Sequence, residues 1–212
     1  MNTFLAFKKF EEQVLPSQVL LSLFQEYSSP LDKIGDWVEK GYLIQLRRGL
    51  YIPGPNSGLM VPELFSISNH LYGPSYISLE SALSFWGLIP ERVFGVYAIS
   101  LQRSKVIETP VGRFEYRNMS DHYYYLGVNS ISLSSKQRVL MANKEKAVID
   151  KIVLTPGVQF RSKEDVIGYF ERDLRVEMED LFEFDLNMIR SWIPKLPKQR
   201  SFEKFCDVIE RL

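Results

Sequence analysis

The sequence predicts an α+β protein in which an N-terminal winged helix-turn-helix precedes a C-terminal α+β domain with an antiparallel sheet and terminal helices. Three observations support this prediction. Apolar residues recur at helical spacing over the first 40 residues, and a β-hairpin pattern follows directly. After residue 92 the period changes to two before helical spacing returns. A stretch rich in Gly, Pro, Asn and Ser predicts a linker at residues 54–59 between domains spanning residues 1–53 and 60–212.

Composition sets the broad class. With 45% hydrophobic residues the chain can form a core, and its 26 basic and 26 acidic residues cancel, so nucleic-acid binding would need a local basic patch. The single cysteine, Cys206, excludes an internal disulfide and a cysteine-built zinc site. No apolar run reaches the roughly 18 residues of a membrane span, and the first residues make a poor signal peptide. We therefore expect a cytoplasmic protein without a membrane partner.

Three helices are predicted before the hairpin. Apolar spacing favours helices over residues 2–14 and 16–27. The third runs from Pro30 towards Gly41, with Ser29 at the N-cap position and a left-handed glycine at its end. Its buried face is predicted to consist of the apolar residues at helical spacing, which are Leu31, Ile34 and Val38.

The predicted hairpin pairs residues 42–46 with residues 50–52, and Pro53 ends the second strand. Arg47 and Arg48 lie in the turn between the strands. A helix that leads directly into a hairpin with arginines at its tip is the layout of a winged helix.

Two kinds of DNA contact follow from this layout. Lys33, Asp36 and Lys40 recur on the third helix away from its predicted buried face, so we expect them to reach base edges or phosphates in the major groove. Arg47 and Arg48 would contact phosphate or a narrow minor groove.

An alternative stays open for the same residues. Adjacent arginines at an exposed turn are usually only solvated, and the first 58 residues contain six basic and six acidic residues. The domain could then be a winged-helix docking domain in a protein-interaction module that does not bind DNA. If it does bind DNA, a neutral domain needs dimerisation for useful affinity, so we expect a homodimer on inverted repeats in double-stranded promoter DNA.

The second domain is predicted to contain a helix pair, a strand-rich block and further helices. The predicted helices cover residues 62–71, 78–86, 141–155, 165–170, 186–192 and 202–212. The predicted strands cover residues 93–102, 104–109, 113–117, 123–125 and 128–133.

Charge is distributed unevenly along this domain. Residues 103–151 contain nine basic and five acidic side chains, whereas residues 164–190 contain three basic and nine acidic side chains. The basic segment could add contacts to DNA phosphates, or it could pair with the acidic segment within the monomer.

No catalytic or metal site is predicted, so we expect a protein that is not an enzyme and that holds no cofactor. Glu145 and Asp150 are five residues apart, which does not place them on one helical face. We expect them to pair with the adjacent Lys146 and Lys151 at the surface or between domains. Ser78 is interpreted as a helix cap.

The sequence also contains few candidate metal-ligating residues. His70 and His122 are the only histidines, and no acidic or cysteine cluster accompanies them at metal-ligand spacing. Neither a phosphate loop nor a nucleotidyltransferase signature is present.

Four ordered motifs carry a resemblance over about residues 15–155. They are RRGLY at 47–51, YISLESAL at 76–83, TPVGRFEY at 109–116 and ANKEKAVID at 142–150. Together they resemble the AbiEi-like antitoxin regulators of abortive-infection, type IV toxin–antitoxin systems, which act in phage defence. The resemblance implies an N-terminal DNA-binding domain that represses its own operon. It also implies a C-terminal domain that counters a nucleotidyltransferase-like toxin without requiring stable contact with that toxin.

Overall fold

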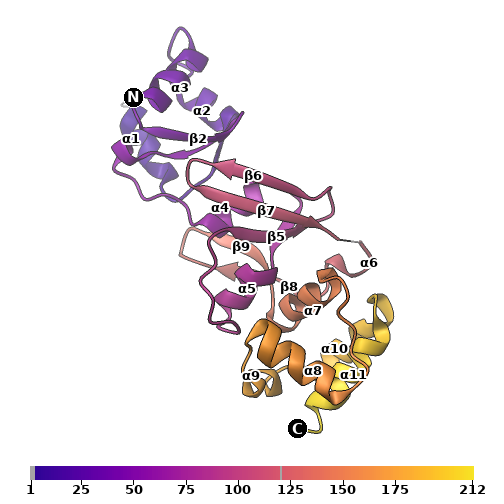
Figure 1. Cartoon of the computed structure of the whole chain (residues 1–212). Coiled ribbons are helices and arrows are strands. Elements are labelled where there is room, and N and C mark those ends of the chain that lie inside the picture. Colours follow the sequence, from indigo (N-terminus) through magenta and orange to yellow (C-terminus); the bar gives the residue numbers. More distant parts are fainter. Residues whose placement is uncertain (1–2, 120) are drawn as a thin grey trace.

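The computed structural model describes residues 3–119 and 121–212 of the chain. Its parts follow one another along a long axis in Figure 1. A small N-terminal unit lies at one end, a six-stranded sheet with helices packed on it lies in the middle, and a group of helices forms the C-terminal end. The chain is therefore of mixed α+β class, as the sequence predicts.

The N-terminal unit combines three helices with a three-stranded antiparallel sheet, in the order β1-β3-β2. Its elements are α1 (Thr3–Phe7), β1 (Leu15–Pro16), α2 (Ser17–Leu23), α3 (Pro30–Glu39), β2 (Leu43–Arg47) and β3 (Leu50–Pro53). The first two helices are shorter than predicted, and Asn2, the predicted start of the first, lies outside the described residues. The short strand β1, which pairs with β3, was not predicted.

Trp37 is the centre of the N-terminal core. Its ring lies 4.8 Å from the ring of Phe24 and 5.0 Å from the ring of Phe7, measured between centroids. Ile34 is buried beside it, but Leu31 is 68% exposed, so the prediction that Leu31 belongs to the buried face is wrong. The aromatic rings gather around Trp37, almost two turns beyond Leu31, and leave the first turn of α3 in solvent.

The segment predicted as a linker is hydrogen-bonded to the N-terminal unit. Asn56 donates from its backbone N–H to the carbonyl of Gly41 over 3.0 Å and from its side chain to the carbonyl of Lys40 over 2.8 Å. A Cβ at Gly54 would stand only 2.3 Å from the carbonyl oxygen of Gly41, so only glycine fits there. The chain enters the second unit over residues 60–63, which lie outside helices and strands. The expected division into residues 1–53 and 60–212 stays a prediction.

The sheet of the second unit has the strand order β6-β7-β5-β4-β9-β8. Its strands are β4 (Ser75–Ile77), β5 (Val96–Ser100), β6 (Lys105–Thr109), β7 (Gly112–Asn118), β8 (Val128–Ser132) and β9 (Arg138–Ala142). Three of the pairings are antiparallel, as predicted, whereas β5 pairs with β7 and β4 pairs with β9 in parallel. The sheet is therefore mixed.

Two local predictions in this unit are wrong. Tyr123 and Tyr124 belong to the short helix α6 (Asp121–Tyr124) rather than to a strand, and both are buried. The helix predicted from Met141 begins only at Lys144, because Asn143 accepts a hydrogen bond from the backbone N–H of Lys146 and caps it. Met141 itself lies in β9, where it pairs with β4.

Helices cover the sheet and form the C-terminal end. They are α4 (Leu64–Leu71), α5 (Leu79–Phe85), α7 (Lys144–Leu154), α8 (Lys163–Gly168), α9 (Met178–Phe182), α10 (Leu186–Trp192) and α11 (Gln199–Ile209). A π-helical turn, Tyr169–Leu174, extends α8. Among the described residues, no helix is both long enough and apolar enough to cross a membrane.

The two units share apolar and polar contacts. Leu46, Leu50 and Ile52 of the β2–β3 hairpin belong to the same buried cluster as Ile67 and Leu71 of α4. The hairpin is therefore packed against the second unit.

Polar contacts cross the same boundary, because Glu12 of the N-terminal unit accepts hydrogen bonds from Ser134, at 2.7 Å, and from Gln137, at 3.0 Å. Glu12 has a φ of 60°, a left-handed conformation that costs a non-glycine residue about 1–2 kcal/mol. The contacts that Glu12 makes across the boundary help to offset this cost.

The hydrogen bonds to Glu12 predict that the stability of the fold depends on pH. The hydrogen bonds from Ser134 and Gln137 hold the pKa of Glu12 below its ordinary value of 4.5. Its contribution to stability is therefore present above pH 4.5 and is lost as the pH falls through the lowered pKa of the folded state. In thermal denaturation over an acid pH series, Glu12→Gln should remove this part of the pH dependence. An identical pH dependence in parent and variant would contradict the assignment.

Candidate nucleic-acid interface

The three predicted major-groove residues of α3 form one chain of ion pairs. Lys33 Nζ lies 2.8 Å from Asp36 Oδ2, and Lys40 Nζ contacts Asp36 Oδ1. The hydrogen bonds from Lys33 and Lys40 lower the pKa of the Asp36 carboxyl group. Lys33 also lies over the ring of Tyr27, 5.3 Å from its centroid. The structure thus brings all three residues together, but their charged groups are already engaged with one another.

The two arginines predicted in the β2–β3 turn differ in their surroundings, and Arg47 is the last residue of β2, so only Arg48 lies in the turn itself. Arg47 donates from Nε to the carbonyl oxygen of Leu71 over 3.1 Å, so it joins the turn to the end of α4. Arg48 is exposed to solvent. Gly49 follows with a φ of 80°, the left-handed conformation that reverses the chain between the strands.

Two further cations lie near this turn and were not predicted individually. Tyr72, the residue after Leu71, donates from its hydroxyl to the carbonyl oxygen of Arg103 over 3.1 Å. Its ring lies beneath Lys105, whose Nζ is 5.4 Å from the ring centroid. The end of α4 therefore lies between the β2–β3 turn and the start of β6.

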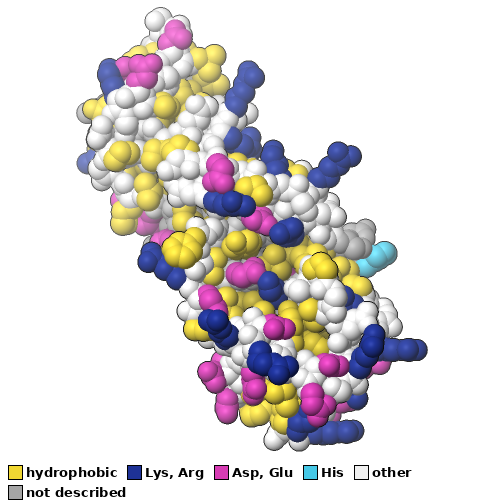
Figure 2. All heavy atoms as spheres, viewed as in Figure 1, with side chains coloured by type: hydrophobic (Ala, Val, Ile, Leu, Met, Phe, Trp, Pro, Cys, Tyr) yellow, Lys and Arg dark blue, Asp and Glu magenta, His cyan; other side chains and the backbone are white. Residues whose placement is uncertain are grey.

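We call Arg47, Arg48, Arg103 and Lys105 the basic strip. In Figure 2, basic side chains gather along the upper right edge, where the N-terminal unit meets β6 and β7. The sequence indicates Arg103 and Lys105 only through the excess of basic over acidic side chains in residues 103–151. That balance indicates that the segment is basic, but it does not show which of its basic side chains lack a carboxylate partner.

The basic strip differs from the rest of the basic segment in its pairing. Arg113 and Arg117 both pair with Glu115, and Lys144 pairs with Glu183 of the acidic segment over 2.9 Å. For the strip, by contrast, no carboxylate among the described side chains, those of residues 3–119 and 122–212, lies within 4.0 Å. Pairing with the acidic segment is therefore confirmed for Lys144, whereas contacts of the basic segment with DNA phosphates stay a prediction.

The exposed face of α3 has a different character. Leu31, Asp32 and Glu39 are all exposed there, and Leu31 is among the most exposed large apolar side chains of the described chain. Carboxylates repel DNA phosphates, so this face adds no general attraction to nucleic acid.

Asp150 and Lys146 of α7 belong to a buried polar network in the second unit. Lys146 and Asp150 are both fully buried and form an ion pair over 2.8 Å, one turn apart on α7. Asp150 also accepts hydrogen bonds from the hydroxyls of Tyr76, at 2.9 Å, and Ser78, at 2.6 Å. Lys146 donates to the carbonyl oxygen of Tyr123 over 2.9 Å.

This network corrects the predicted ion pairs. Asp150 pairs with Lys146 rather than Lys151, which instead pairs with Glu80. Glu145 is buried and accepts a hydrogen bond from the backbone N–H of Asp185, so the pair predicted between Glu145 and Lys146 is not formed.

Ser78 occupies the N-cap position of α5, but its side chain does not cap the helix and instead donates to Asp150. Burial raises the pKa of the Asp150 carboxyl, while Lys146, Ser78 and Tyr76 oppose that rise. Because the carboxyl group is fully buried, it cannot reach a substrate from solvent.

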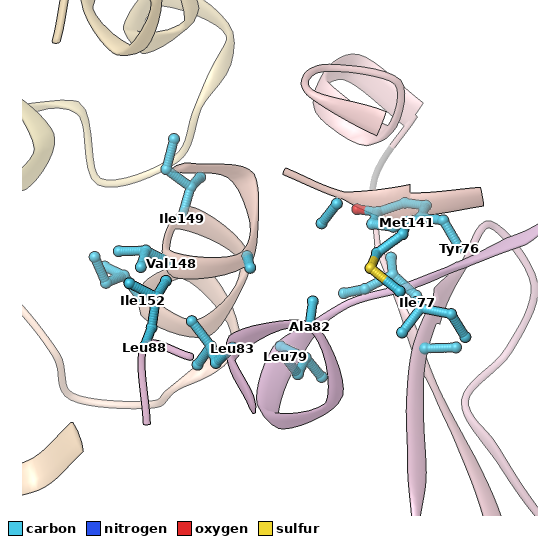
Figure 3. Packing of buried hydrophobic residues seen from close by; sticks show 14 of the residues in the cluster. Tyr76, Ile77, Leu79, Ala82, Leu83, Leu88, Met141, Val148, Ile149 and Ile152 are labelled. Atoms are coloured by element: carbon cyan, nitrogen blue, oxygen red, sulfur yellow. The ribbon is translucent and has the colours of Figure 1, made fainter. Parts of the chain in front are cut away.

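The surrounding hydrophobic core joins α7 and β9 to β4 and α5. Figure 3 shows this packing for Tyr76, Ile77, Leu79, Ala82, Leu83, Leu88, Met141, Val148, Ile149 and Ile152. The segments that carry two of the four sequence motifs thus pack together as one structural unit. Across the described part of the chain, no three His, Cys, Asp or Glu side chains gather as metal ligands.

Comparison with known proteins gives a fold but no family. The sequence matches no family model and no curated protein. A similar solved structure is that of the RV2827C protein from Mycobacterium tuberculosis, with a TM-score of 0.61 at 12% sequence identity. The match covers 97% of this chain and 75% of that one, so the fold likeness extends over both units.

Proposed function

We propose that this protein is a DNA-binding transcriptional autorepressor and antitoxin of a type IV toxin–antitoxin system. The observation that carries DNA binding is the basic strip, in which four exposed cations from both units lie close together without carboxylate partners among the described residues. Such a strip suits a phosphate backbone, because each cation that contacts a phosphate releases a condensed counterion.

The order of elements in the N-terminal unit supports the proposal. It runs helix, strand, helix, helix, strand, strand, which is the order of a winged helix-turn-helix. In that fold α3 would be the recognition helix and the β2–β3 hairpin the wing. Lys33, Asp36 and Lys40 would face the major groove, and Arg48 would meet phosphate or the minor groove.

The antitoxin part of the proposal rests on the four ordered motifs that resemble AbiEi-like regulators. A gene for a nucleotidyltransferase-like toxin beside this one would support it. Co-expression with that toxin should restore growth, and an Arg48→Ala variant should still do so, because Arg48 lies in the N-terminal unit and antagonism is assigned to the second unit. Loss of both activities in an Arg48→Ala variant would contradict this separation.

Promoter binding over a salt series tests the basic strip. Replacing Arg48 and Lys105 together with alanine should weaken binding to all sequences. It should also reduce the log–log salt slope by about two units, close to 0.9 for each phosphate contact. These two are preferred to Arg47, because removing Arg47 also removes its bond to Leu71. The measurement is fluorescence anisotropy with the protein's own promoter and with unrelated duplex DNA.

The control is Lys195→Ala, which removes an exposed cation at the C-terminal end of the molecule. It should leave the salt slope unchanged. Equal slopes for the parent and the double variant would remove the strip from the interface. Absence of promoter binding by the parent at every salt concentration would overturn the DNA proposal itself.

The exposed face of α3 favours a second candidate, a protein-interaction module that does not bind DNA. Leu31 between acidic side chains suits a protein partner better than a phosphate backbone. If the parent binds no promoter DNA, Leu31→Ser should abolish partner binding while leaving the fold intact.

A further inference from the structure

The most exposed large hydrophobic side chain among the described residues is Phe94, which is 89% exposed. It lies in the loop before β5, beside a groove of about 350 Å³ between α4, α5 and the β6–β7 turn. Phe65, Phe85 and Val111 contribute apolar walls to this groove. Large exposed apolar patches on soluble proteins commonly mark sites of association.

The groove is also positively charged. Arg92 and Arg113 line it, and none of its described lining residues is acidic. Arg113 is within 4.0 Å of Glu108 and Glu115, whereas Arg92 stacks on Phe94, 5.8 Å from its ring centroid. Arg92 is thus the cation most available to a partner carboxylate.

A complementary surface lies on the same molecule. Phe182, at the end of α9, is 51% exposed. Glu179, one helical turn earlier, is exposed as well, and so is Glu177 just before α9, whereas Glu183 pairs with Lys144. An aromatic anchor with an exposed carboxylate one helical turn away matches an apolar groove with an arginine at its edge.

We propose that the Phe94 groove binds α9 of a second copy of this chain, forming a symmetric homodimer. Phe182 would enter the groove beside Phe85 and Phe94, and Glu179 would pair with Arg92. In Figure 1, α5 and α9 both lie toward the left side of the molecule. A twofold axis on this side would allow each copy to offer its groove and receive the other copy's α9, so the contact would be made twice.

The dimer can be tested without DNA, so the result is independent of the proposed DNA-binding function. Sedimentation velocity over a concentration series should show a monomer–dimer equilibrium for the parent. Phe94→Ser and Phe182→Ser should each weaken it by about tenfold or more, because buried aromatic anchors dominate interface energetics. Leu31→Ser, at another exposed apolar side chain, should leave the equilibrium unchanged. Circular dichroism should show parental folding for all three variants, since each changed side chain is exposed.

A charge exchange makes the test specific for this pair of surfaces. Arg92→Glu and Glu179→Arg should each weaken the dimer, and the two changes together should bring the dissociation constant back toward the parent value. A parent that stays monomeric at every concentration would overturn the proposal. A dissociation constant that neither phenylalanine change raises, or that Leu31→Ser raises equally, would also overturn it. The same holds if the double charge variant dimerises as weakly as the two single charge variants.

Discussion

Replacing Asp150 with alanine is expected to lower the free energy of unfolding by about 3–5 kcal/mol, the usual cost of removing one partner from a buried ion pair. Asp150 and Lys146 are both fully buried, and their charged groups are 2.8 Å apart. The alanine variant would leave the ammonium group of Lys146 in the core without a counter-charge. It would also leave the hydroxyls of Tyr76 and Ser78 without their acceptor.

Chemical denaturation of the parent and two variants distinguishes a buried ion pair from simple packing. The double variant Lys146→Met/Asp150→Leu removes both charges and keeps most of the volume. It should be closer in stability to the parent than Asp150→Ala is. If Asp150→Ala unfolds at the parental midpoint, or if the double variant is no more stable than Asp150→Ala, the pair is not buried as described.

Replacing Trp37 with alanine is expected to cost about 3–5 kcal/mol, as truncation of a large core aromatic side chain does. Trp37 is only 6% exposed and contacts the rings of both Phe7 and Phe24. The N-terminal unit has a small core, so few other side chains can compensate for the cavity.

The matched control is Leu31→Ala on the same helix. Leu31 is 68% exposed, so its truncation should change stability by no more than about 0.5 kcal/mol. Urea denaturation followed by far-ultraviolet circular dichroism gives both values without relying on tryptophan fluorescence. Equal midpoints for Trp37→Ala and Leu31→Ala would show that Trp37 is not the centre of the core.

The buried network gives a structural meaning to two of the sequence motifs. Tyr76 and Ser78 come from YISLESAL, and Lys146 and Asp150 come from ANKEKAVID. Asp150 accepts hydrogen bonds from the hydroxyls of Tyr76 and Ser78 and forms an ion pair with Lys146, so each of these polar side chains has a partner in the core, where an unpaired polar group would be costly. The motifs therefore describe how β4 and α5 are joined to α7, and they carry no direct information about a ligand.

Local sequence patterns determined much of the N-terminal unit. Pro30 and Gly41 delimit α3, and the arginine-containing turn between two short apolar runs predicts the β2–β3 hairpin. These features depend on backbone preferences of neighbouring residues, so sequence alone is sufficient for them. The burial of Ile34 was predictable from helical spacing for the same reason.

Pairings between distant residues were decided only by the tertiary structure. The parallel pairing of Ile77 with Met141 and the ion pair between Lys146 and Asp150 depend on which segments meet in the core. The same holds for the basic strip, because the contacts of Leu71 and Tyr72 bring Arg47 near Arg103 and Lys105. Sequence composition determined how many charges the chain carries. Which of them are paired was decided by packing, because a side chain pairs only with the partners that the fold brings within a few ångströms.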